Sequence, residues 1–328
     1  MNPAIPPLRW LSVPEMEQCV DMAATVQLMR SAFQQLSSGK AQVPVRTHMH
    51  FQEERAELLS MPVYLKDQAQ SGLKLVALSH QNPTIGLPFI HALMMVMDAN
   101  NGFPLGCMNG GWITLMRTGA ASGLATDLLA REDAEVLGII GTGAQAMTQL
   151  SAIMEVRPIK KVLLVNRSPE RAHEFRDKAL EKFKCEFHIL DMKADLREAD
   201  VICTCTKSRE PVLTLSQVRP GTHLNAIGAY RADMAEIHAD LLAASAIYID
   251  ERAACDTEAG DLIQARKSHE LTIMGELGEV LLSQIPVRKD DQQITLFKSV
   301  GNAAQDLVLA SYILQKAEEL KLGNLLSL

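Results

Sequence analysis

The sequence lacks the features that would place it in several specialised classes of protein. None of its six cysteines forms a CxxC pair and no histidine cluster has zinc-site spacing, so we predict free thiols and no bound metal. No apolar stretch reaches the roughly 20 residues of a membrane helix, and the start of the chain has no basic segment followed by an apolar run. We therefore expect a cytoplasmic protein that does not enter a membrane.

The chain also lacks a concentration of basic residues. Its net charge is -7, and lysines and arginines are scattered along it, which argues against a nucleic-acid partner. There is no internal repeat and no low-complexity tract. Hydrophobic residues make up 47% of 328 positions, which is enough for the cores of two domains of ordinary size.

The first third of the sequence predicts a helix followed by a sheet. Apolar residues at steps of three and four predict a helix over 14–38, ended by Gly39. Short apolar segments such as 57–62 and 72–78 are broken by prolines and glycines, which favours a sheet of short strands. Asn-Asn-Gly at 100–102 predicts a hairpin turn.

From Thr118 onward strands and helices alternate. We predict a linking helix over 118–130 and a last helix from about 302 to 320, and the alternating strand candidates are 136–140, 162–165, 187–190, 201–205, 223–227 and 246–249. Strands separated by helices of this length indicate βαβ units and a parallel, doubly wound sheet. The predicted fold class is therefore α/β: a Rossmann domain of about 118–301, and an α+β domain of about 1–117 to which 302–328 returns.

The clearest motif joins the strand at 136–140 to the next helix. Gly141, Gly143 and Ala146 form the pattern GxGxxA. The first glycine allows a tight turn, the second allows the backbone to approach a pyrophosphate, and the small third residue lets the helix pack on the strand. Because the motif follows a strand, opens a helix and precedes a second strand, it predicts a nicotinamide dinucleotide site.

The end of the second strand distinguishes the two nicotinamide cofactors. NAD-binding domains carry an acidic residue there for the ribose 2′-hydroxyl. Here the strand ends in Asn166, Arg167 and Ser168, which can bind a 2′-phosphate. We predict NADPH, with NADH also possible. The alternative interpretation is that Arg167 is only a solvated charge and that the protein does not distinguish the two cofactors.

Three cations of the first domain are candidate substrate ligands. Arg46 lies in VPVRT, Lys74 lies within an apolar strand, and Arg117 lies at the domain junction. Arginine binds a carboxylate through two parallel hydrogen bonds, and a buried lysine can lose its charge and act as an acid. Taken singly, each is more commonly a surface charge.

At these residues the chain resembles the ornithine cyclodeaminase/mu-crystallin family over nearly its whole length. The resemblance rests on several long motifs in one order: residues 43–47 (VPVRT), 57–62 (ELLSMP), the strand at Lys74, 117–122 (RTGAAS), 141–146 (GTGAQA), 258–262 (EAGDL), 275–280 (GELGEV) and 297–301 (FKSVG).

The resemblance implies a homodimer formed through the sheet of the first domain, to which the last helix returns. It also implies that Arg46, Lys74 and Arg117 bind a substrate carboxylate, that Glu57 supports that site, and that Val300 and Gly301 pass near the nicotinamide. Lys74 is the candidate catalytic residue. The candidate cofactor-binding residues are Gly141, Thr142, Gly143, Ala144, Gln145, Ala146, Asn166, Arg167, Ser168, Thr206, Val300 and Gly301.

One departure from the family selects the chemistry. Cyclodeaminases carry an aspartate in a GGDCPGK-like stretch, where this chain has Tyr230 and lacks the CPGK residues; Asp233 is more typical of a turn or helix cap. The form resembles the ketimine-reducing branch. It implies NAD(P)H-dependent reduction of a small cyclic imino acid, 1-pyrroline-2-carboxylate or 1-piperideine-2-carboxylate, to proline or pipecolate. The alternatives are an ornithine or lysine cyclodeaminase, an alanine-type amino acid dehydrogenase, and a non-enzymatic NADPH-dependent binding protein. The proton donor is left open between Lys74, bound water and solution.

Overall fold

The computed structural model describes residues 6–51 and 56–327 of the chain. The backbone divides into two units, one comprising Met1–Arg117 and Asn302–Leu328 and the other comprising Thr118–Gly301. The division falls inside helix α3 (Gly110–Leu129). The roles assigned above to the two domains stay predictions.

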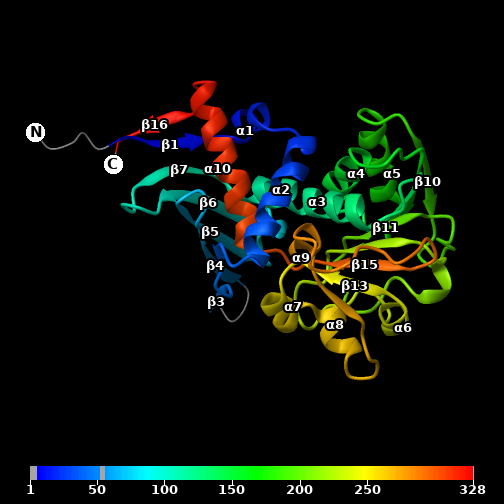
Figure 1. Cartoon of the computed structure of the whole chain (residues 1–328). Helices are drawn as coiled ribbons and strands as arrows, with labels where there is room; N and C mark the ends of the chain where they lie inside the picture. Colours follow the sequence, from blue (N-terminus) through cyan, green and yellow to red (C-terminus); the bar gives the residue numbers. More distant parts are fainter. Residues whose placement is uncertain (1–5, 52–55, 328) are drawn as a thin grey trace, which may run out of the picture. The chain divides into compact units, whose positions relative to one another are not determined.

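Unit 1 contains the first part of the chain and its C-terminal helix (Figure 1). Its helices are α1 (Val13–Cys19), α2 (Met22–Ser37), a short 3-10 helix (Asn82–Ile85), the start of α3 and α10 (Ala303–Glu319). Its strands are β1 (Leu8–Leu11), β2 (Ala41–Gln42), β3 (Thr47–Phe51), β4 (Ala56–Leu65), β5 (Gln70–Ser79), β6 (Ile90–Asp98), β7 (Pro104–Asn109) and β16 (Asn324–Leu326).

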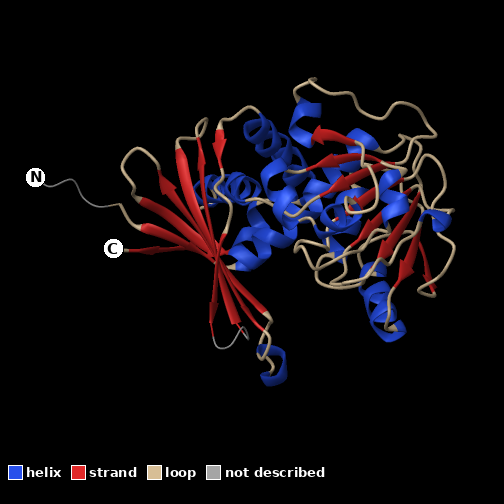
Figure 2. Ribbon diagram, turned by 90° about the horizontal axis from the view of Figure 1, so that it is seen from below, coloured by secondary structure: helices blue, strands red, loops and turns tan. Residues whose placement is uncertain are grey.

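The strands of unit 1 form one sheet in the order β16-β1-β7-β6-β5-β4-β2, with β3 also paired to β4 (Figure 2). Only β1 and β7 are parallel among the described pairings. Helix α10 packs against β4, β5, β6 and α2. The covered face carries Met61, Lys74 and Met94 in one cross-strand row, all buried. Lys74 is therefore a charged residue in the middle of an apolar face.

The expectation of short strands in this sheet is wrong. β4 and β5 each have 10 residues, and β4 runs through Pro62. On one side of β4, β3 pairs with residues up to Ser60 and β2 pairs from Tyr64 onward, so Pro62 lies opposite the gap between them. A residue without an amide hydrogen is tolerated in a strand at such an interruption of the hydrogen-bond ladder.

The helix predicted over 14–38 is two helices. α1 ends at Cys19, Val20 is extended, and the Asp21 carboxylate accepts a hydrogen bond from the Ala24 amide to begin α2. An Asp at this position favours a new helix start because its carboxylate satisfies an otherwise unpaired N–H group. The predicted turn at 100–102 is confirmed, with Gly102 at φ 75° between β6 and β7.

Unit 2 holds the alternating strands and helices. Its helices are the rest of α3, α4 (Ala146–Met154), α5 (Pro169–Leu180), a 3-10 helix (Leu215–Gln217), α6 (Ala239–Ala243), α7 (Arg252–Glu258), α8 (Gly260–Ala265) and α9 (Leu277–Leu281). Its strands are β8 (Val136–Ile140), β9 (Lys161–Val165), β10 (Glu186–Leu190), β11 (Val201–Thr204), β12 (His223–Ala226), β13 (Ala246–Ile249), β14 (Ile273–Glu276) and β15 (Thr295–Lys298).

All strand pairings of unit 2 are parallel, in the order β10-β9-β8-β11-β12-β15-β13-β14. Successive β11 side chains enter different cores: Val201 packs with residues of α4 and α5, and Ile202 packs with residues of α6 and α8. The predicted α/β class with a doubly wound parallel sheet is confirmed. The strand order reverses between β8 and β11, which is where such sheets bind ligands.

Two boundaries in this region differ from the prediction. The linking helix α3 begins at Gly110 rather than Thr118, because it follows directly after the last residue of β7. β14 and β15 and the short helices α6 to α9 were not predicted individually. These segments are short. Some are apolar throughout and others are interrupted by polar residues, so none shows a clear helical or strand periodicity of hydrophobic residues.

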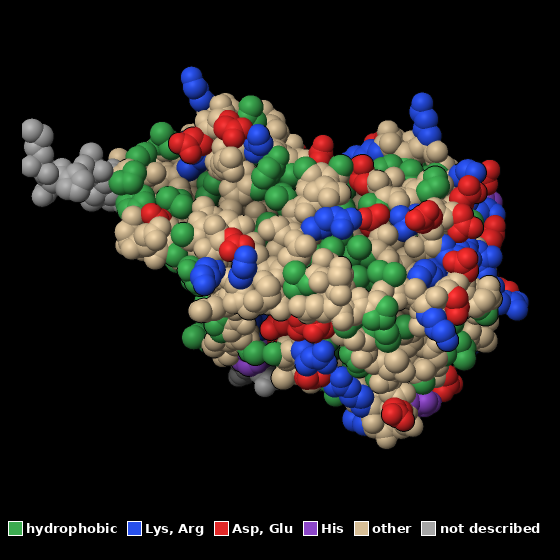
Figure 3. Space-filling view, viewed as in Figure 1, with side chains coloured by type: hydrophobic (Ala, Val, Ile, Leu, Met, Phe, Trp, Pro, Cys, Tyr) green, Lys and Arg blue, Asp and Glu red, His purple; other side chains and the backbone are tan. Residues whose placement is uncertain are grey.

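The distribution of surface charge and the state of the cysteines match what the sequence predicts. Lysine, arginine and acidic side chains are interspersed on the face shown in Figure 3. All six cysteines are free, as predicted. Within the described residues, no helix combines the length and the apolar character that crossing a membrane requires.

Candidate active site

The glycine turn of unit 2 has the geometry that its sequence predicts. Gly141 adopts φ +95°, and a Cβ at this position would lie 2.8 Å from Thr206 Cγ2. A Cβ at Gly143 would have no atom within 4 Å, so space is open beside the backbone there. Ala146 is fully buried at the start of α4. The turn thus offers close backbone approach and helix N–H groups to a pyrophosphate.

The end of β9 lies against this turn. The Asn166 side-chain oxygen accepts a hydrogen bond from the Thr142 amide, and the hydroxyl of Thr142 is buried without a partner among the described residues. Ser168 caps α5 by accepting from the Arg171 amide, and Arg167 is exposed. An unpaired buried hydroxyl at a glycine turn is the kind of group that a bound ligand satisfies.

Buried Glu236 organises the loops that follow β11 and β12. Its carboxylate accepts hydrogen bonds from the amides of Thr206 (2.6 Å), Gly228 (2.7 Å) and Ala229 (3.2 Å), and from the Thr204 hydroxyl (3.0 Å). Burial, followed by the neighbouring Asp261, raises the pKa of Glu236. One carboxylate therefore fixes the carboxyl ends of two adjacent strands, at the edge where a dinucleotide binds.

A buried ion pair supports Glu236. Lys298 Nζ lies 2.7 Å from Asp261 Oδ2, and both side chains are fully buried. Asp261 also accepts hydrogen bonds from the amides of Glu236 and Ile237. The motifs EAGDL and FKSVG thus meet in space. Sequence reasoning noted these motifs but assigned Asp261 and Lys298 no role.

Asp250 holds the segment predicted to pass near the nicotinamide. Its Oδ2 accepts hydrogen bonds from the Ser299 hydroxyl (2.7 Å) and from the amides of Val300 (2.9 Å) and Gly301 (2.6 Å). Gly301 adopts φ 77°. A carboxylate that accepts three hydrogen bonds fixes this segment firmly. An acidic residue ending an apolar strand was the available sequence signal.

In unit 1 two of the predicted cations converge on one carboxylate. Asp306, fully buried near the start of α10, lies 2.5 Å from Lys74 Nζ and 3.2 Å from Arg117 Nε. Arg117 also donates to the Gln305 side-chain oxygen at 2.8 Å, and Lys74 to the Thr114 hydroxyl at 3.3 Å. Asn302 caps α10, and Asp306, four residues later, binds both cations.

The buried surroundings change the acidity of Lys74. Burial first, with smaller effects of the cations Arg117 and Arg46, lowers its pKa to about 8, and Asp306 acts in the opposite direction. A lysine with such a pKa exchanges protons near neutral pH, as acid–base catalysis requires. Nearby, the side-chain amide nitrogens of Asn302 and Gln305 are buried without partners among the described residues. The cluster therefore has hydrogen-bond donors that a bound ligand could use.

Of the remaining candidates, Arg46 is near enough to Lys74 for its charge to lower the pKa of Lys74. Arg46 is half-buried just before β3. Glu57 is on the covered face of β4, four residues from the row that contains Lys74, or about 14 Å along the strand. Tyr230 packs partly against a unit 2 core. The structure thus joins Lys74 and Arg117, and it does not bring Glu57 to them.

The comparisons with known proteins agree with this geometry. The model of the ornithine cyclodeaminase/mu-crystallin family matches residues 10–321. This chain belongs to that family. A Delta(1)-pyrroline-2-carboxylate reductase of Bacillus cereus is 35% identical over 96% of this chain and 98% of its own length.

Two solved structures are similar throughout. That of Thermococcus litoralis Delta(1)-pyrroline-2-carboxylate reductase, in complex with NADH and L-proline, has a TM-score of 0.92, with 36% identity over 97% of this chain and 99% of its own. An archaeal alanine dehydrogenase dimer with bound NAD has a TM-score of 0.90, with 30% identity over 98% and 99%. The family resemblance read from the sequence is confirmed.

The two glycines of the turn should respond differently to substitution. Gly143→Ala should leave the apo melting temperature unchanged, because its Cβ meets no atom, and should weaken NADPH binding at least ~10-fold, because the methyl group fills the space that the pyrophosphate needs. Gly141→Ala should reduce both stability and binding, because it combines positive φ with a steric clash. Calorimetry and fluorescence titration measure the two effects. Unchanged NADPH affinity in Gly143→Ala would contradict this site.

Proposed function

We propose that this protein reduces a small cyclic imino acid to the corresponding cyclic amino acid with a nicotinamide cofactor. The substrates are 1-pyrroline-2-carboxylate or 1-piperideine-2-carboxylate, and the products are proline or pipecolate. The observation that carries the proposal is the buried cluster of Lys74, Arg117 and Asp306, in a chain that matches a pyrroline-2-carboxylate reductase along its whole length.

The residues of unit 1 supply binding and proton control. Arg117 uses Nε and Nη1 in the hydrogen bonds above and keeps Nη2 for the substrate carboxylate, with Arg46 as a second cation. A nicotinamide cofactor held at the glycine turn of Gly141 and Gly143 would supply the hydride that reduction of an imine carbon requires, and the imine nitrogen needs a proton. Lys74, with its lowered pKa, is placed to hold that proton or the carboxylate. Orientation of this kind supplies up to about 7–11 kcal/mol of a barrier.

NADPH is the cofactor we favour over NADH. Support comes from Arg167, exposed at the end of β9, and from the start of α5 at Ser168, whose helix N–H groups suit a 2′-phosphate. Glu170 opposes this preference, because its carboxylate accepts the Ser168 hydroxyl at 2.7 Å and adds a negative charge. The solved reductase of Thermococcus litoralis holds NADH.

Parallel assays separate the proposed activity from its rivals. With 1-pyrroline-2-carboxylate or 1-piperideine-2-carboxylate, NADPH absorbance should fall at a rate proportional to enzyme concentration. Pyruvate with ammonia tests an alanine-type dehydrogenase, and ammonia release from ornithine tests a cyclodeaminase. We expect no cyclodeamination, because Tyr230 replaces the aspartate that handles the amino group of ornithine.

Each assay result points to one of the candidate functions. Turnover of a cyclic imine that exceeds turnover of pyruvate supports the proposal. Ammonia from ornithine without net NADPH oxidation would establish the lyase instead. NADPH binding with no turnover of any of these compounds would leave a binding protein. Repeating the imine assay with NADH gives the cofactor preference as a ratio of kcat/KM values.

Lys74 should set the basic limb of the pH profile. Its protonated form exists below its pKa of about 8, so kcat/KM should fall as pH rises through that value. Lys74→Met should lower turnover at least ~100-fold, the lower end of the contribution of a general acid. NADPH affinity should persist, since the glycine turn belongs to unit 2.

Two further variants test this role. Asp306→Asn should move the fall in activity to lower pH, because Asp306 raises the pKa of Lys74. Lys40→Met is the control, since Lys40 is an exposed lysine of the same unit, paired with Asp67. Full activity of Lys74→Met, in protein that melts like the wild type, would refute the assignment.

We also propose that two copies associate through the uncovered face of the unit 1 sheet. Cross-strand pairing places Met49 beside Leu58 and Leu75 beside Leu93, on the face opposite Lys74. Met49 is 60% exposed and Leu93 is 45% exposed. Exposed apolar side chains on one face of a sheet are typical of a protein interface.

The association predicts a particle of two 36.0 kDa chains in sedimentation equilibrium. Leu93→Glu should shift the mass toward one chain, because a charge would be buried against an apolar partner. Leu180→Glu is the matched control, on the exposed surface of α5 in unit 2. A wild-type protein of single-chain mass would exclude the dimer.

A further inference from the structure

We propose that His48, His50 and Glu57 form a binding site for a divalent transition-metal ion of the Zn²⁺ class. The three residues lie on adjacent antiparallel strands of unit 1. His48 and His50 are two positions apart on β3, so both side chains point to the same face, and His50 pairs directly with Glu57 on β4. Among the described residues, their ligand atoms form a group within 4.8 Å of one another.

The distances are close to those of a metal-binding group. His48 Nδ1 lies 3.6 Å and His50 Nδ1 3.8 Å from the same oxygen, Oε2 of Glu57. Metal–ligand bonds of about 2.0–2.1 Å in a tetrahedron place ligand atoms about 3.4 Å apart. Both Nδ1–Oε2 distances are thus within a few tenths of an ångström of the spacing between two ligands of one metal ion. The rings are nearly parallel, with centroids 6.2 Å apart and an angle of 20°.

The ligand types and their exposure define the ion. Two imidazoles and one carboxylate suit Zn²⁺, Co²⁺ or Ni²⁺ better than Mg²⁺ or Ca²⁺, which prefer oxygen ligands. The Glu57 side chain is 10% exposed, whereas the His48 and His50 side chains are 40% and 54% exposed. The ion would therefore have three protein ligands on one side and water on the other.

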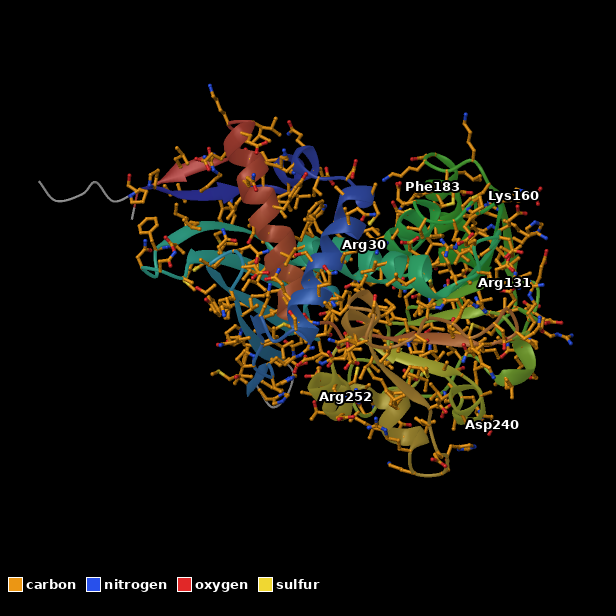
Figure 4. All side chains as sticks on the ribbon, in the orientation of Figure 1. Arg30, Arg131, Lys160, Phe183, Asp240 and Arg252 are labelled. Atoms are coloured by element: carbon orange, nitrogen blue, oxygen red, sulfur yellow. The ribbon has the colours of Figure 1, made fainter. Side chains whose placement is uncertain are left out.

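Among the described residues, the other histidine–carboxylate contacts do not converge in this way. His188 contacts Glu186, and no other carboxylate contact of His188 is found in the described part of the chain. Asp240, labelled in Figure 4, faces His238 with Oδ2 and His269 with Oδ1, so the two imidazoles contact different oxygens. Sequence reasoning predicts no metal because it looks for ligands at spacings along one segment. The third ligand here comes from a neighbouring strand.

The position of the site suggests what an ion would change. β3 pairs only with β4 among the described strands, so an ion bound to both would cross-link them. Arg46, a proposed substrate ligand, immediately precedes β3. Occupancy should therefore alter KM for the imino acid. This consequence rests on the proposed function, whereas the site itself does not.

Calorimetric titration of the metal-free full chain with ZnCl₂ tests the site. The wild type should bind one Zn²⁺ per chain. His48→Gln and His50→Gln should each weaken that binding at least ~10-fold, and the double variant should lose it. With Co²⁺ as the probe, the wild type should show the intense visible absorption of a low-coordinate cobalt site, and the double variant should not.

The controls are His91→Gln, a histidine of the same sheet outside the cluster, and His269→Gln, which removes half of the Asp240 group. Both should bind Zn²⁺ like the wild type. Melting curves and NADPH titration establish that each variant is folded. Equal Zn²⁺ binding by the wild type and the double variant, or no binding by either, would overturn the proposal.

Activity gives a separate arm of the test. In a chain that reduces cyclic imines, Zn²⁺ should change KM at least ~2-fold in the wild type and in His91→Gln but not in the double variant. Unchanged KM at saturating Zn²⁺ would overturn the coupling to substrate. Zn²⁺ binding at the cluster in a chain without reductase activity would support the metal site and refute only the proposed reaction.

Discussion

The carboxylate of Asp306 is the group on which unit 1 depends. It is fully buried and compensates two buried cations, which come from β5 and α3. Removing one member of such a group leaves an uncompensated charge in the interior, at a cost of about 3–5 kcal/mol. The cluster therefore fixes the start of α10 to the sheet. It also limits the effect of burial on Lys74: burial lowers the pKa of Lys74 to about 8, Asp306 acts in the opposite direction, and the amine therefore stays mostly protonated at neutral pH.

Unit 2 also depends on buried carboxylates, but there they hold loops rather than compensate a pair of cations. Glu236 and Asp250 are buried carboxylates that accept amide hydrogen bonds from loops at the ends of strands, and Lys298 with Asp261 supports the first of them. Backbone amides that are already paired do not need to reorganise when a ligand arrives. In both units, buried carboxylates fix the groups that make up the candidate site.

The sequence predicted features that depend on neighbouring residues better than features that depend on residues far apart in the chain. Strands 136–140 and 246–249 were predicted to the residue, and the glycine turn was identified, because their signals are local. The long β4 was misjudged, because tolerance of Pro62 depends on where β2 and β3 stop pairing. The partner of Lys74 was unresolved, because it lies 232 positions away. Glu236, Asp261 and Asp250 were missed for the same reason.

The return of α10 to unit 1 has a consequence for biosynthesis. The chain leaves unit 1 after Arg117 and re-enters it at Asn302. During translation from the N-terminus, the ribosome therefore completes every strand of the unit 2 sheet before it adds Asp306. Until then Lys74 and Arg117 have no counter-charge, so their buried positions are unfavourable. The cation pair therefore acquires its buried partner only after all of unit 2 has been synthesised.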